Sequence, residues 1–146
     1  MPAPSGADEV ALLALRAGGE LVCLRVLEIS GLLKARTVVP VPSARPELVG
    51  LCGVRGAVLP VYGLARLLRI PEEPGAPRWM VLAGPRDGLV ALAFGGLEGH
   101  LVVRAEDLHR AAPGQLAVRH VAEVVQRERP LPVVSVPSLL RAIMGG

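Results

Sequence analysis

The sequence predicts an all-β protein with short helices, built as a barrel or a sandwich. Apolar runs of strand length recur roughly every ten residues along the chain. Glycine (17) and proline (14) are abundant and fall largely between these runs, where turns need them. The chain has 146 residues, 51% of them hydrophobic and 20% charged, which suits one domain with a sizeable core. We expect residues 1–8 to form a flexible tail and residues 9–144 a single domain.

The first part of the domain is predicted to be a hairpin followed by extended chain. Residues 10–16 form an apolar run, and Gly18-Gly19 marks a tight turn into a second strand over residues 21–29. Residues 30–34 are predicted to be a short connection. Residues 37–41 form another strand-like run, which ends in a Pro-Val-Pro sequence.

The central stretch, residues 47–70, carries the strongest pattern. Its first apolar run, residues 48–54, contains Gly50 and Gly53, and glycines inside a strand predict a bulge or a close approach of another backbone. Arg55-Gly56 is predicted to be a turn before a second strand over residues 57–62. Leu64, Leu67 and Leu68 then follow a short helical period that ends before Pro71.

The remaining chain continues the strand-and-turn pattern. Residues 79–83 and 89–94 are predicted to pair as a hairpin around residues 84–88. Shorter elements follow: a strand at 101–103, a helical turn at 105–109, a turn at 111–114, and strands at 118–125 and 131–136. Ser138 is predicted to cap a last helix over residues 139–144.

Composition and charge exclude several functions. The net charge is +3, but the arginines are scattered, and a single Trp, Tyr and Phe offer no stacking platform for nucleic acid. The longest apolar stretches, residues 56–65 and 88–97, are too short to span a membrane. The N-terminus lacks the basic and apolar regions of a signal peptide. We therefore expect a soluble, cytoplasmic protein, in which the high hydropathy reflects either an exposed apolar patch or an aliphatic core.

No residue set has the spacing of a catalytic or metal site. The three histidines, at positions 100, 109 and 120, show no metal-ligand spacing. A nucleophilic set of Cys52, His100 and Asp107 can be written down, but Cys52 lies in an apolar run that should bury it and raise its pKa. Cys23 also lies in such a run. We expect no enzyme activity, cofactor or metal; the alternative is a small enzyme or ligand-binding domain on an all-β scaffold.

Two charged residues, Glu28 and Arg55, stand alone at the ends of apolar segments. They are interpreted either as two independent exposed charges or as a partly buried ion pair that lines a groove facing a partner. Such a pair would be worth roughly 0.2–1 kcal/mol if it is partly exposed.

The central stretch resembles the signature of CheW-like domains. The matching positions are Gly50, Arg55, Gly56, Val58, Leu59, Pro60, Val61, Leu64 and Leu67. The sequence Val26-Leu27-Glu28-Ile29 resembles the end of the family's second strand, and residues 130–143 resemble its closing strand and helix. Four glycines stand where the family usually has polar residues: Gly53, Gly63, Gly95 and Gly96.

The resemblance implies a fold of two packed SH3-like barrels of five strands each. It also implies a non-catalytic coupling protein that links the cytoplasmic tip of a chemoreceptor to the regulatory domain of a CheA-type histidine kinase, with other CheW-like proteins as further partners. The implied partner-binding residues are Val26, Glu28, Ile29, Gly50, Arg55 and Gly56. Because polar family positions have become glycine, the alternative is a divergent adaptor that binds the receptor only, similar to the second coupling protein of Frz-type gliding systems.

Overall fold

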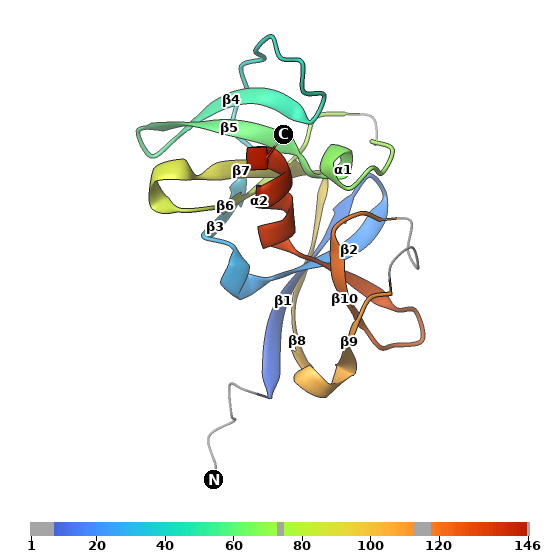
Figure 1. The fold of residues 1–146 in the computed structure, drawn as a ribbon. Helices are drawn as coiled ribbons and strands as arrows, with labels where there is room; N and C mark the ends of the chain where they lie inside the picture. Colours follow the sequence, from blue (N-terminus) through green and yellow to red (C-terminus); the bar gives the residue numbers. More distant parts are fainter. Residues whose placement is uncertain (1–7, 73–74, 113–117, 146) are drawn as a thin grey trace.

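The computed structural model describes residues 8–72, 75–112 and 118–145, and it contains two β-sheets with short helices (Figure 1). The all-β class is confirmed. Most of the predicted tail, residues 1–7, lies outside the described residues. The strands are β1 (Glu9–Ala17), β2 (Glu20–Arg25), β3 (Gly31–Lys34), β4 (Leu48–Val54), β5 (Ala57–Gly63), β6 (Trp79–Ala83), β7 (Val90–Phe94), β8 (Gly96–Arg104), β9 (Leu108–Arg110), β10 (Val121–Val125) and β11 (Leu131–Val134).

In the described residues, one α-helix and three 3₁₀ turns lie between strands, and a second α-helix follows β11. The helices are α1 (Leu64–Leu67) and α2 (Val136–Gly145), and the turns are η1 (Val26–Glu28), η2 (Arg86–Gly88) and η3 (Ala105–Asp107). No helix in the described part of the chain is long and apolar enough to cross a membrane.

The first sheet has six strands in the order β8-β1-β2-β11-β10-β9. β1 and β2 form the expected hairpin, with both turn glycines, Gly18 and Gly19, at positive φ. The edge strands β8 and β9 are consecutive in the chain, joined only by η3, and this bend curls the sheet toward a barrel. Five strands were expected from the sequence; the sixth arises because η3 divides one curved run into two.

The second sheet has five strands in the order β3-β6-β7-β5-β4. β5 pairs with β7 in parallel, and the other strand pairs are antiparallel. The chain beyond β3 bridges to β4 at Val39 and Leu51, with backbone hydrogen bonds of 2.8 and 2.9 Å. This bridge connects the chain after the edge strand β3 to the other edge strand, β4, so the second sheet also closes into a barrel.

The strand alternation divides the apolar residues between two barrel interiors and a shared interface. Along β1, Leu12 and Ala14 pack inside the first barrel, whereas Leu13 and Leu15 face a larger cluster. That larger cluster contains side chains from both sheets, from α1 and from α2. The second barrel has its own interior, which contains Cys52, Leu59, Val61, Met80 and Ala91.

Helix α2 contributes a narrow apolar stripe to the shared interface. Val136, Leu139 and Ile143 are its buried residues, spaced three and four apart on one face. Ser135 precedes the helix, and its Oγ accepts a hydrogen bond from the N–H of Ser138 (3.1 Å). The prediction that Ser138 caps the helix is therefore wrong. The helix begins at Val136, and Pro137 is tolerated in its first turn because an N–H group there has no intrahelical partner.

Other sequence predictions also differ from the structure. The strand expected over residues 21–29 ends at Arg25 and continues as η1, and the connection expected at 30–34 contains β3. The run at 37–41 makes one bridge instead of a strand. Pairing with β6 makes residues 31–34 a strand, and the run at 37–41 reaches β4 only through its bridge.

Candidate partner-binding surface

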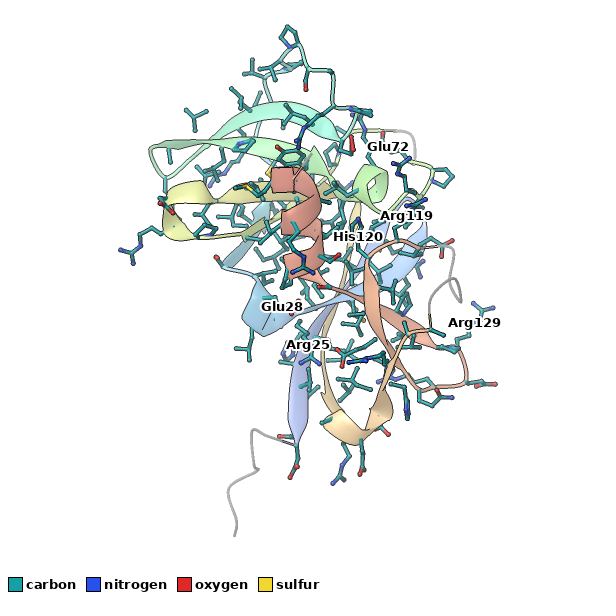
Figure 2. All side chains as sticks on the ribbon, in the orientation of Figure 1. Arg25, Glu28, Glu72, Arg119, His120 and Arg129 are labelled. Carbon is teal, nitrogen blue, oxygen red and sulfur yellow. The ribbon has the colours of Figure 1, made fainter. Side chains whose placement is uncertain are left out.

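Glu28 is positioned by the end of β2 and reaches the start of α2. Its Oε1 accepts a hydrogen bond from the backbone N–H of Val136 at 3.2 Å, and the side chain is half-buried. Figure 2 shows Glu28 beside the lower end of α2. The first N–H groups of a helix lack intrahelical partners and carry partial positive charge, so a carboxylate here is favourable. Glu28 therefore ties the first barrel to the interface helix.

Arg55 lies elsewhere, at the tip of the β4–β5 hairpin. Arg55 and Gly56 both have positive φ, 51° and 81°, as a tight two-residue hairpin turn requires. The Arg55 side chain is exposed and forms no ion pair within the described residues. Figure 1 shows this hairpin tip well separated from the chain after β2. The interpretation of Glu28 and Arg55 as an ion pair is therefore wrong; the turn geometry points Arg55 into solvent.

The segment Val26–Ile29, which we call the η1 segment, presents one residue outward and holds the others in place. Val26 and Ile29 pack against the shared interface, and Glu28 is bonded to α2. Leu27 is 96% exposed, the largest exposure among the large hydrophobic side chains of the described chain. The sequence pattern did not single out Leu27, because the residue counted as part of a half-buried strand.

The η1 segment is also fixed on its N-terminal side. Arg25 donates from Nε (3.0 Å) and Nη2 (2.6 Å) to Oε1 of Glu123 on β10. Both side chains are partly buried, which makes the pair less screened than a surface ion pair. With Arg25 held by β10 and Glu28 held by α2, Leu27 is presented on a rigid turn, which lowers the entropy cost of binding.

The two remaining predicted site residues have clear structural roles. A Cβ on Gly50 would lie 2.2 Å from the carbonyl oxygen of Val39, so only glycine allows the barrel-closing bridge. A bulge at Leu48–Gly50 accompanies this contact, as the glycine pattern predicted. At Gly56 a Cβ would meet nothing within 4 Å, and the constraint is its positive φ. Contact of either glycine with a partner stays a prediction.

Two of the four glycines that depart from the family pattern line the same cavity. Gly63 precedes α1, and Gly95 lies between β7 and β8, yet both line a single cavity of about 430 Å³. Arg66, Glu72 and Arg78 stand around it, and Arg66 donates to Glu72 and, at 2.6 Å, to the carbonyl oxygen of Pro46. Polar side chains at positions 63 and 95 would occupy this space.

The structure does not assemble the catalytic set that the sequence allowed. Cys52 lies inside the second barrel, whereas His100 and Asp107 belong to β8 and η3 of the first sheet. Burial raises the pKa of the Cys52 thiol, against a smaller opposing effect of Arg36, as expected. Burial likewise raises the pKa of Cys23, to about 11. Within the described residues, no group of three or more His, Cys, Asp or Glu side chains could hold a metal.

Two packed barrels and an interface helix that is hydrogen-bonded to the first barrel define a small all-β module. A family model for the CheW-like domain matches residues 11–144. The chain therefore belongs to the CheW-like domain family.

The crystal structure of the scaffolding protein TtCheW from Thermoanaerobacter tengcongensis is similar to the structure of this chain, with a TM-score of 0.77 and 12% sequence identity. The match covers 89% of this chain and 91% of that one, so the two share the fold of paired SH3-like subdomains. No curated protein sequence matches the chain.

Proposed function

We propose that this protein is a non-catalytic coupling protein that links the tip of a chemoreceptor to a CheA-type histidine kinase in the cytoplasm. The observation that carries the proposal is the η1 segment, which presents Leu27 on a turn bonded to both β10 and α2. Membership of the CheW-like family, whose relative TtCheW is described as a scaffolding protein, supports the same function.

The proposed receptor surface consists of the η1 segment and the adjoining face of β1 and β8. η1 contacts β1, β1 pairs with β8, and the side chain of Val102 on β8 is 50% exposed. Exposed apolar side chains on a rigid framework suit the apolar face of a helical hairpin, which is the form of a receptor tip. Arg55, on the β4–β5 turn, is proposed as a separate contact.

A second candidate, an adaptor that binds the receptor but not the kinase, is favoured by the shared cavity of Gly63 and Gly95. Binding to a homologous barrel needs side chains that fix register and anchor the contact. Glycines supply neither.

Two titrations test these proposals. The purified protein is titrated at equal salt with a receptor signalling fragment and, separately, with the kinase regulatory domain. Micromolar or tighter binding to both supports the coupling protein, and binding to the receptor alone supports the second candidate. Failure to bind the receptor would contradict both, and Leu27→Asp serves as the variant expected to lose receptor binding while staying folded.

A further inference from the structure

A second cavity, of about 250 Å³, lies where α1, α2 and the segments before β4 and β10 meet; we call it the Glu47 cavity. Its lining includes Arg45 and Glu47 before β4, Arg69 after α1, and Arg119 and His120 before β10. Figure 2 shows Arg119 and His120 beside α2. Among the described residues that line it, none belongs to the η1 segment.

The polar groups of this cavity are poorly matched to one another. Glu47 Oε2 is buried and has no hydrogen-bond partner within the described residues. Glu47 forms no ion pair with the three arginines that share the cavity, although each ion pair found elsewhere in the described chain brings opposite charges within 3.2 Å. A buried carboxylate oxygen without a donor is rare and costly, and it indicates a missing partner.

Two of the three arginines that line the cavity also have unpartnered side chains in the described residues. Arg45 donates to the carbonyl oxygen of Ile143 at the end of α2, but the side chains of Arg69 and Arg119 have no partner within the described residues. Both are exposed, whereas Glu47 Oε2 and the ring of Tyr62 are buried. The lining of the cavity therefore combines a carboxylate with one unpartnered oxygen and two guanidinium groups on exposed side chains.

The cavity walls are held in place before any ligand arrives. Gly63 donates to the carbonyl oxygen of Glu47 (2.9 Å), and Arg119 donates to that of Leu68 (3.1 Å), so backbone bonds connect the segments around the cavity. Arg69 and His120 adopt positive φ, 61° and 65°, which costs a non-glycine residue about 1 kcal/mol or more. Walls fixed in this way suit a small ligand.

We propose that this cavity binds a small zwitterion of the amino-acid type, with its ammonium group toward Glu47 and its carboxylate toward Arg69 and Arg119. The ammonium would donate to the carboxylate of Glu47, which lines the cavity and has one oxygen without a donor in the described residues, and a carboxylate accepts well from guanidinium groups. A simple anion would satisfy the arginines but would be repelled by Glu47. A simple amine would leave the arginines unmatched.

Matched ligands test the proposal on the whole protein. L-alanine carries both charged groups, propionate carries only the carboxylate, and ethylamine carries only the ammonium. Each is titrated into the protein while the backbone amides of Gly63 and Arg119 are followed by NMR. We expect saturable binding of alanine, about tenfold tighter than either monofunctional probe, since each charge-assisted contact is worth about that factor. Alanine binding no tighter than propionate, or no saturation by any probe, would overturn the proposal.

Variants locate the site. Glu47→Gln should weaken alanine about tenfold without weakening propionate, whereas Arg119→Gln should weaken both. Arg129→Gln, an exposed arginine in the β10–β11 turn and distant from the cavity in Figure 2, is the matched control and should change neither. If Glu47→Gln fails to fold, the exposed Arg119→Gln still decides the matter: unchanged alanine affinity in that variant contradicts the site.

Discussion

The carboxylate of Glu28 accepts a hydrogen bond from the backbone N–H of Val136, 108 positions further along the chain. This contact connects the end of β2 to the first turn of α2, whose apolar stripe packs into the interface between the barrels. At the other end of α2, Arg45 donates to the carbonyl oxygen of Ile143. The helix is thus bonded at both ends to segments from different parts of the chain, which fixes the η1 segment relative to the interface.

The helix contact predicts a stability change at Glu28. Glu28→Ala should lower the free energy of unfolding by about 0.5–2 kcal/mol, because the N–H of Val136 loses its acceptor and the helix N-terminus loses a negative charge. Glu28→Gln should cost less, since the amide oxygen can still accept. Urea unfolding measures both, and Glu128→Ala, an exposed change in the β10–β11 turn, is the control. Equal stability of Glu28→Ala and the control would mean that the bond contributes nothing.

The separation of Glu28 and Arg55 predicts an additive double-mutant cycle. Arg55 is exposed at a hairpin tip and Glu28 bonds to α2, so the two share no contact. Glu28→Gln and Arg55→Gln should therefore change unfolding free energy and receptor affinity independently, within about 0.5 kcal/mol. A coupling energy above that range, measured by titration of the receptor fragment, would show that the two charges interact after all.

The lowered pKa of His120 predicts that the protein loses stability in mild acid. Burial, and then the nearby charges of Arg119 and Arg141, lower its pKa below the usual 6.5. A lowered histidine pKa means that the unfolded chain takes up the proton more readily than the folded one. Its contribution to stability is complete above pH 6.5 and declines as the pH falls through the folded pKa.

A variant isolates this contribution. His120→Asn keeps a residue type that tolerates the positive φ of this position and removes the titrating ring. The unfolding free energy of the variant should therefore depend less steeply on pH between about 6.5 and 5 than that of the unmodified protein. Identical slopes in urea unfolding across this range would contradict the role of His120.

Much of the fold could be predicted because strong local patterns coincide with tertiary pairing. The strands at 48–54, 57–62 and 79–83 are bounded by glycine, proline or charged turns, and the structure keeps them almost unchanged. Gly50 was also predictable as a close-approach site, since a glycine between apolar strand residues commonly marks a bulge or a neighbouring backbone.

The candidate site was less predictable, because its geometry depends on distant residues. Glu28 was singled out as a lone charge, but its acceptor role depends on where α2 begins, and Ser135 and Pro137 decide that. Leu27 is one of several aliphatic residues in the strand predicted at 21–29, and the strand ends at Arg25 in the structure. The Glu47 cavity combines residues from segments that no local pattern links.

The buried thiols predict slow labelling and sensitivity to alkali. Cys23, with a pKa of about 11 against 9.0 in the unfolded chain, resists ionisation when folded. The unfolded state ionises first, so stability is complete below pH 9.0 and falls as the pH approaches about 11. Labelling by a thiol reagent at a pH below 9.0 should require unfolding for both cysteines. Rapid labelling of Cys52 in the native protein would contradict its burial and reopen the nucleophile hypothesis.

The receptor-only candidate predicts a gain of kinase binding when side chains are restored at the β7–β8 connection. A Cβ on Gly95 would meet nothing within 4 Å, and one on Gly96 would only touch the Arg16 Cβ at 3.4 Å, so Gly95→Asp with Gly96→Arg should fold. If the candidate holds, the unmodified protein binds the kinase domain more weakly than micromolar, because buried anchors at such contacts are worth about 2 kcal/mol or more each.

The double variant should then improve kinase affinity about two- to fivefold, the range of exposed charge pairs, without changing receptor affinity through the η1 segment. Gly145→Asp near the end of α2, where an added Cβ also meets nothing, is the matched control for added charge. Titration of each variant with both partners at equal salt measures the effect. Micromolar binding of the unmodified protein to the kinase domain would remove the receptor-only candidate and leave the two-partner coupling protein.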